Sequence, residues 1–138
     1  MTSVGERLEE LHSILEELEQ LEEGWVILVE GRRDRMALAI MGVHKETREV
    51  QSEGGLFGLA ESLAQEGKKA LILSDWDRTG GRIARNLREA LAANEVPYDD
   101  DLRARLSRIT RKDIKDVESL PSLYSRLVTE AERRRELP

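Results

Sequence analysis

Residues 70–81 of this chain read Ala-Leu-Ile-Leu-Ser-Asp-Trp-Asp-Arg-Thr-Gly-Gly. The first residues form a short apolar run, the pattern of a strand buried on both faces of a sheet. Asp75 and Asp77 follow at once, and a helix is predicted from about Gly81 to Ala93. An acid that ends a buried strand does not serve the core, because an unpaired buried charge is costly. The segment therefore predicts a strand, a functional loop and a helix, in that order.

A second buried strand is predicted over residues 25–29, which read Trp-Val-Ile-Leu-Val. It also ends at an acid, Glu30, and Gly31 follows. The next helix ends at Gly42 and is expected to bury four apolar residues, namely Met36, Leu38, Ala39 and Ile40. Strand, helix, strand and helix in this order indicate right-handed parallel crossovers, so the fold class predicted is α/β.

The other elements of the α/β domain rest on weaker patterns. We expect a short strand around 47–50, a helix over 56–65 closed by Gly67, a short strand or sheet edge around 96–98, a short helix capped within 99–101 and reaching Leu106, and helical structure over 113–136 with a break near Pro121.

Residues 2–23 are predicted to form a helix with a stripe of leucines. Ser3 and Glu6 match a capping box at its start, and Gly24 is placed to end it. The stripe packs on the domain or, alternatively, pairs with the same helix of a second copy in a homodimer. The chain thus divides into an N-terminal helix (1–23), an α/β domain (24–110) and a C-terminal helical extension (111–138).

Composition excludes several classes of site. The 138 residues contain no cysteine and two histidines, so disulfides, thiolate zinc sites, thiol nucleophiles and histidine-rich metal sites are ruled out. Lys and Arg number 22 against 28 Asp and Glu, and a net charge of −6 does not suit a protein that wraps nucleic acid by bulk charge. No apolar run approaches the roughly 18 residues of a membrane span. We expect a cytoplasmic protein without a membrane partner.

The two acid-terminated strands predict a common site. Ligands of an open parallel sheet bind beyond the carboxyl ends of its strands, where Glu30, Asp75 and Asp77 are expected. Two carboxylates two residues apart can turn toward one divalent ion, and oxygen ligands suit Mg²⁺ or Mn²⁺. Gly80 permits a tight turn, and the helix that starts there favours an anion. Alternatively, the two aspartates cap the loop and the helix.

These residues resemble the Toprim domain, which is shared by bacterial-type primases, type IA and type II topoisomerases and several nucleases. Residues 26–34 match its first motif, a strand that ends in Glu-Gly with Asp three residues beyond the glycine. Residues 71–80 match its second, a strand that runs into Asp-x-Asp-x-x-Gly. Residues 80–85, Gly-Gly-Arg-Ile-Ala-Arg, look most like small stand-alone Toprim proteins, some of them archaeal. They are also similar to the ribonuclease that matures small ribosomal RNA.

The resemblance implies a Toprim-like (Rossmann-like), mostly parallel sheet flanked by helices, with helical extensions at both termini. It implies metal-dependent phosphodiester chemistry on a nucleic acid, with RNA favoured over DNA as the substrate and cleavage or processing as the reaction. Glu30 would act as a general acid/base or metal ligand, and Asp75 and Asp77 would hold Mg²⁺ or Mn²⁺. The candidate phosphate-binding residues are Arg32, Arg33, Arg78, Gly80, Arg82 and Arg85. A topoisomerase tyrosine domain or a primase zinc module does not fit in this length.

Two other functions compete with this one. Residues 71–79 also fit the Asp-x-Asp-x-Thr motif of haloacid-dehalogenase-like phosphatases, in which Asp75 would be the phosphorylated nucleophile and Asp77 the acid/base. That reading leaves Glu30 without a role. A non-catalytic adaptor would keep the acids but bind nucleic acid or an RNA-processing partner. Trp76 either stacks on a base or packs under the loop, and residues 112–118 are expected to be a helix start and a charged face.

Overall fold

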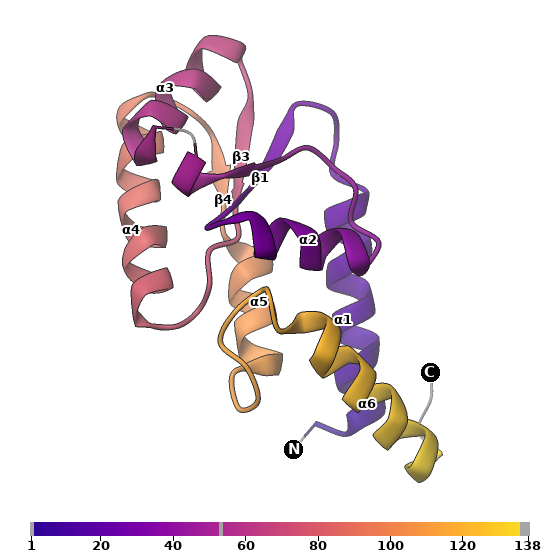
Figure 1. The fold of residues 1–138 in the computed structure, drawn as a ribbon. Coiled ribbons are helices and arrows are strands. Elements are labelled where there is room, and N and C mark those ends of the chain that lie inside the picture. Colours follow the sequence, from indigo (N-terminus) through magenta and orange to yellow (C-terminus); the bar gives the residue numbers. More distant parts are fainter. Residues whose placement is uncertain (1, 53, 136–138) are drawn as a thin grey trace.

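A four-stranded sheet in which all strands are parallel forms the centre of the chain, with the strand order β2-β1-β3-β4 (Figure 1). This computed structural model describes residues 2–52 and 54–135. Along the chain the elements are α1 (Val4–Glu19), β1 (Trp25–Val29), α2 (Arg32–Ile40), β2 (Thr47–Glu49), the 3-10 helix η1 (Val50–Ser52), α3 (Gly55–Glu66), β3 (Lys69–Ile72), α4 (Arg78–Ala93), β4 (Tyr98–Asp99), α5 (Asp101–Thr110) and α6 (Leu120–Arg134). The prediction of an α/β, Rossmann-like fold with a parallel sheet and terminal helices is confirmed.

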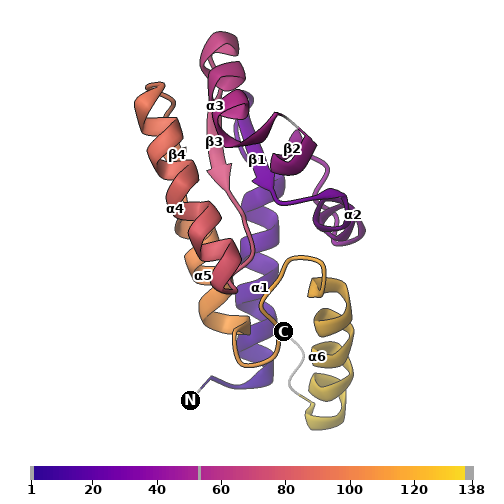
Figure 2. The same cartoon turned by 60° about the vertical axis from the view of Figure 1, so that its left-hand side comes forward.

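Helices cover both faces of the sheet, which explains why its two central strands are continuously apolar. Val26 and Leu28 of β1 and Ile72 of β3 belong to the layer formed with α3 and α4. Ile27 of β1 and Leu71 of β3, which are register partners, belong to the opposite layer with α1, α2, α5 and α6. Figure 1 shows α3 and α4 on the left of the strands and α1 and α2 on their right, and in the turned view of Figure 2 α5 overlaps α4 while α2 and α6 lie on the right. Alternate residues of each strand therefore enter different cores.

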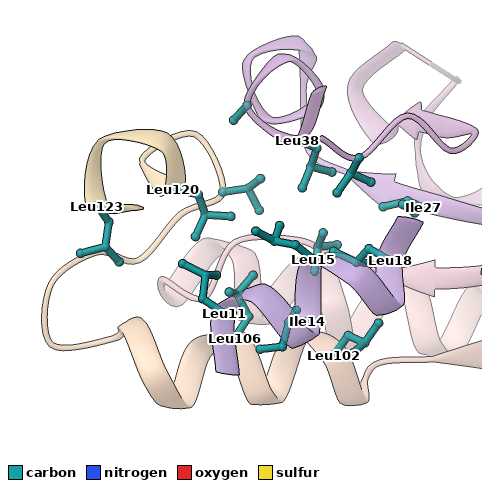
Figure 3. Packing of buried hydrophobic residues seen from close by; sticks show 14 of the residues in the cluster. Leu11, Ile14, Leu15, Leu18, Ile27, Leu38, Leu102, Leu106, Leu120 and Leu123 are labelled. Atoms are coloured by element: carbon teal, nitrogen blue, oxygen red, sulfur yellow. The ribbon is translucent and has the colours of Figure 1, made fainter. Parts of the chain in front are cut away.

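The leucine stripe of α1 is buried inside the same chain. Leu11 has no exposed surface and packs in one cluster with Leu106 of α5 and Leu123 of α6 (Figure 3). The capping box of Ser3 and Glu6 is present. Of the two alternatives for the stripe, packing on its own domain is the one observed. The homodimer and the domain boundaries at 23 and 110 stay predictions.

Two expectations about helices α1 and α2 are wrong. Helix α1 ends at Glu19, before Gly24, which instead adopts a φ of 99° in the turn that leads into β1. The apolar side of α2 was predicted to be buried, but Met36 is 50% exposed and Ile40 is 71% exposed. Ala39 is exposed too. This nine-residue helix buries only the narrow stripe made by Asp34, Ala37 and Leu38, so the residues a quarter turn or more away face outward.

The boundaries of three other elements differ from the prediction. Strand β3 ends at Ile72 rather than Ser74, and α4 begins at Arg78 rather than Gly81 because Asp77 caps it. Residues 113–119 are not helical. Helix α6 begins at Leu120 with Pro121 in its first turn, where proline's missing N–H removes no helical hydrogen bond. None of the described helices is long and apolar enough to cross a membrane.

We expect Leu11→Ala to lower the free energy of unfolding by about 2–5 kcal/mol, because it opens a cavity where α1 meets the terminal helices. Glu9→Ala, on the exposed side of the same helix, is the control and should stay within about 0.5 kcal/mol of the wild type. Urea unfolding of both variants measures this. A wild-type midpoint that rises with protein concentration, together with an unchanged Leu11→Ala midpoint in dilute solution, would show instead that the stripe works between copies.

Candidate functional site

The acids that end the two central strands meet at one edge of the sheet. Pairing of β1 with β3 continues past the strand end, where the Leu73 N–H donates to the Leu28 carbonyl oxygen at 2.8 Å. Two residues on, the backbone N–H of Asp75 donates to Oε2 of Glu30, also at 2.8 Å. The structure thus brings Glu30 and Asp75 into direct contact, as the two motifs predicted from their positions after parallel strands.

A close approach between α4 and the loop before it shapes this edge. A Cβ atom added to Gly80 would lie 1.9 Å from the carbonyl oxygen of Asp75, so no other residue fits there without movement. The Gly80 N–H donates to Oδ1 of Asp77 at 2.7 Å, and the Ser74 hydroxyl donates to the Gly80 carbonyl oxygen at 2.9 Å. Asp77 is exposed and caps α4. Capping is the alternative observed for Asp77, and its sharing of an ion with Asp75 stays a prediction.

Burial and negative charge combine at Asp75. Desolvation raises the pKa of its carboxyl from 3.8 to about 8, and the charges of Asp34, Glu30 and Asp116 add to the rise. The Val117 N–H, which donates to Oδ1 of Asp75 at 2.9 Å, opposes it by stabilising the carboxylate.

Asp34, like Asp75, combines burial with nearby negative charge. This residue is 7% exposed and accepts the Gly31 N–H at 3.0 Å. Burial raises the pKa of Asp34, and the hydrogen bond from Gly31 lowers it in part. The negative charges of Glu30, Glu118 and Asp116 raise this pKa further. Within the described chain, no lysine or arginine forms an ion pair with Glu30, Asp34 or Asp75. These three acids therefore lack a direct ion-pair partner, although the charge of Arg103 in α5 also acts on Glu30 and Asp75.

Residues 114–118 close over the site as a loop, which corrects the prediction of a helix start and a charged face. The Trp76 N–H donates to the Lys115 carbonyl oxygen and its indole Nε1–H donates to the Ile114 carbonyl oxygen, both at 2.9 Å. Trp76 is half-buried against the core, so packing under a loop is the alternative observed for it. This loop brings in Asp116, a site residue that the sequence reasoning missed. The repeated acid-x-acid spacing at 116–118 is the signal that could have found it.

Arg103 of α5 is a second residue that the sequence reasoning missed. Its Nε–H donates to the Ser74 carbonyl oxygen at 2.9 Å, and its Nη2 donates to the Asp75 carbonyl oxygen at 2.7 Å. Burial lowers the pKa of this guanidinium and the charge of Arg88 lowers it further, while nearby acids oppose the shift. No local pattern marks Arg103, because its partners are backbone atoms nearly thirty positions away in the chain.

The predicted phosphate-binding arginines lie on two helices. Arg32 and Arg33 are exposed in the first turn of α2, where Nη1 of Arg33 lies 3.5 Å from Oε1 of Glu118. Arg78, Arg82 and Arg85 are exposed on α4. The α4 arginines line a groove of about 360 Å³ together with Gly81 and Arg88. A larger cavity of about 930 Å³ lies at the opposite end of the sheet, beside Trp25 and Lys69.

Glu30 and Asp75 each use one carboxylate oxygen in the hydrogen bonds above, which leaves Oε1 and Oδ2 without a hydrogen bond from the described residues. In the described part of the chain, no group of three or more His, Cys, Asp or Glu side chains is arranged to hold a metal ion. Mg²⁺ is commonly bound by one or two carboxylates, with waters and substrate phosphates completing its shell. The open oxygens of Glu30 and Asp75 are ligands of the type that such an ion takes.

Comparison with known proteins finds relatives along most of the chain, although no family model matches it. A UPF0292 protein of Methanosarcina acetivorans is 38% identical over 122 residues, which is 88% of this chain and 83% of the relative. A UPF0292 protein of Thermococcus sibiricus is 35% identical over 124 residues, 88% of this chain and 94% of the relative. A solved structure from Aquifex aeolicus has a TM-score of 0.66 at 24% identity, and covers 80% of this chain and 97% of that one. The last likeness supports the fold alone.

The glycine pair at the start of α4 offers a matched test. Gly80→Ala should lower the free energy of unfolding by about 1–3 kcal/mol or more, because its Cβ strikes the Asp75 backbone. At Gly81 an added Cβ meets nothing within 4 Å, so Gly81→Ala should raise stability by about 0.5–1 kcal/mol through its better helix propensity. Chemical denaturation of both variants measures the difference. Equal effects would contradict the close approach of α4 to the loop.

The raised Asp75 pKa predicts a stability that falls as pH rises. Between pH 4 and 8 the folded carboxyl keeps a proton that the unfolded chain has lost, so the free energy of unfolding decreases by up to about 1.4 kcal/mol per pH unit. Asp75→Asn removes this group. In EDTA, the wild type should lose stability relative to Asp75→Asn from pH 5 to 8, and the difference should level off above pH 8. Parallel stability curves would show that Asp75 titrates normally.

Proposed function

We propose that this chain, which belongs to the UPF0292 family, is a cytoplasmic, divalent-metal-dependent enzyme of the Toprim type. Its proposed reaction is the cleavage or processing of nucleic acid, with RNA favoured over DNA as the substrate. The observation that carries the proposal is the contact between Glu30 and Asp75 at the carboxyl ends of adjacent parallel strands. Asp34 and Asp116 add negative charge at the same point. The motif resemblance assigns the same two acids to phosphodiester chemistry.

The charge balance of the site supports a cation as its ligand. Asp75 would hold Mg²⁺ or Mn²⁺ through Oδ2, the oxygen that its hydrogen bond leaves open, with Asp77 as a further candidate ligand. When bound, such an ion supplies charge stabilisation at a phosphate oxygen. A protonated Asp75 would give up its proton to make room for the ion, so ion binding should tighten as pH rises.

The chain's own groups have separable tasks in this proposal. The Asp75 N–H holds Oε2 of Glu30, which leaves Oε1 to accept a proton from the attacking water. Arg103 and the Val117 N–H hold the Asp75 loop in position. The start of α4 and the arginines on α2 and α4 would bind substrate phosphates, since the chain as a whole carries a net charge of −6 and does not attract nucleic acid by bulk charge.

Glu30→Gln and Asp75→Asn test the assignment. With Mg²⁺ or Mn²⁺, the wild type should cleave an oligoribonucleotide, and each variant should lose at least about 100-fold in rate because a proton acceptor or an ion ligand is gone. Glu30→Gln should keep its affinity for the oligonucleotide. The ion should raise the melting temperature of the wild type but not that of Asp75→Asn. Glu9→Gln, on the exposed side of α1, is the control and should match the wild type.

The two alternative functions predict other results from the same assay. A haloacid-dehalogenase-like phosphatase would hydrolyse a generic phosphomonoester, would need Asp75 and would be indifferent to Glu30→Gln. A non-catalytic adaptor would bind the oligonucleotide and cleave nothing under any ion. Undiminished activity of Glu30→Gln, or a wild type without metal-dependent cleavage, would contradict the proposed function.

A further inference from the structure

We propose that the exposed face of α4 is a track for a single strand of nucleic acid. In this proposal Arg78, Arg82 and Arg85 each contact one of three successive phosphates and lead the strand away from the acids. The identity of the strand rests on the proposed function, whereas the track itself rests on the geometry of α4. The proposal adds the form of the substrate and its path, which the acid site by itself does not specify.

The spacing of the three arginines matches one face of the helix. They lie four and three residues apart, and residues at such spacings are neighbours on a helix surface. With a rise of about 1.5 Å per residue, successive guanidinium groups start about 4.5–6 Å apart along the axis. Neighbouring phosphates on one strand of nucleic acid are separated by a distance of the same scale. Each arginine of the row can therefore contact one phosphate of the strand.

The three arginines are available for a ligand. All are exposed, and within the described residues none of them forms an ion pair or a hydrogen bond. They line one groove of about 360 Å³, whose wall at Gly81 has no side chain. Arg88 continues the row, but its Nη1 is held 3.0 Å from Oδ2 of Asp100. The free part of the row is therefore bounded at one end by this ion pair.

The other end of the row is the start of α4, which directly follows the Asp75 loop in the chain. Asp77, which caps α4, immediately precedes Arg78, and Asp75 is two residues before Asp77. Gly80 on the inward face of α4 contacts the Asp75 loop, whereas the three arginines are exposed on the outward face. A strand bound along this row would leave the helix beside Arg78, at the start of α4.

The surroundings favour a nucleic acid strand over an acidic protein. A protein partner gains most of its affinity from buried aromatic or apolar groups, but the exposed large apolar side chains of the described chain are Met36, Ile40, Phe57 and Tyr98, none of them on α4. A duplex presents two rows of phosphates, whereas α4 offers one row of free arginines. A single row of arginines without an exposed large apolar side chain beside it on α4 fits one strand of a polyanion.

Binding of oligouridylates of two to eight nucleotides, measured by fluorescence anisotropy in EDTA, tests the track without requiring catalysis. Affinity should rise steeply up to the tetramer, which has three phosphodiesters, and slowly thereafter. The slope of log K against log salt should be near −2, from about −0.7 per phosphate. Each of Arg78→Ala, Arg82→Ala and Arg85→Ala should reduce that slope by about 0.7, and Arg82→Lys should keep it. Arg126→Ala, an exposed arginine on α6, is the matched control and should change nothing.

Three results would overturn the proposal: a slope that no α4 variant changes, a hairpin duplex that binds more tightly than a single strand of equal length, or an oligoglutamate of equal charge that binds as tightly. These outcomes are independent of the enzyme assignment. Binding with the expected slopes but no cleavage under Mg²⁺ supports the track and contradicts the proposed enzyme. If all three α4 variants cleave the oligonucleotide and bind it with wild-type affinity, that result supports the proposed enzyme and contradicts the track.

Discussion

The hydrogen bond from the Asp75 backbone N–H to the Glu30 carboxylate depends on the parallel register of β1 and β3. That register pairs Trp25 with Lys69 and Leu28 with Ile72, and the Leu73 N–H extends it by one further bond. Because the two strands are parallel and in step, their carboxyl ends arrive together, and the acids that follow them meet. Burial on both faces makes this register hard to shift, since a slip by one residue would exchange the side chains of the two cores.

Contacts from distant parts of the chain hold the Asp75 loop in its observed position. Gly80 lets α4 approach from one side, and Arg103 of α5 holds two backbone carbonyl groups of the loop from another. The segment 114–118 closes the third side through Trp76 and the Val117 N–H. The terminal helices reach the site through these contacts. Helix α1 packs on α5, which carries Arg103, and on α6, which follows the closing loop in the chain.

Charge is segregated in this chain rather than spread evenly. The acids at the strand ends are close enough, and buried enough, that the pKa values of Asp34 and Asp75 rise. The free arginines of α4 begin at Arg78, on the outside of the helix. An acidic site of this kind attracts a cation, and a neighbouring cationic row attracts a polyanion. In the proposed function, a divalent ion held by the acids and the cationic row would together bind a phosphate substrate, even though the net charge of −6 opposes it at long range.

The α/β class, both central strands and the pairing of Glu30 with Asp75 could be predicted from local patterns. A strand buried on both faces must be continuously apolar, and an acid at its end has no place in a core. The capping box at Ser3 was local too. The orientation of α2 was not, because Met36 and Ile40 are apolar residues that the neighbouring elements leave uncovered.

Tertiary structure decided the roles of Trp76, Arg103 and Asp116, and it chose between the two local alternatives for Asp77. Asp77 caps α4 because the loop turns it toward Gly80. Arg103 reaches the site from α5 through backbone partners that carry no sequence signature, and Asp116 reaches it through its charge once the 114–118 loop has closed. Sequence periodicity reports which face of an element is apolar. It does not report which distant segment will cover that face or close over the loop beside it, because that depends on how the packed layers fit together in space.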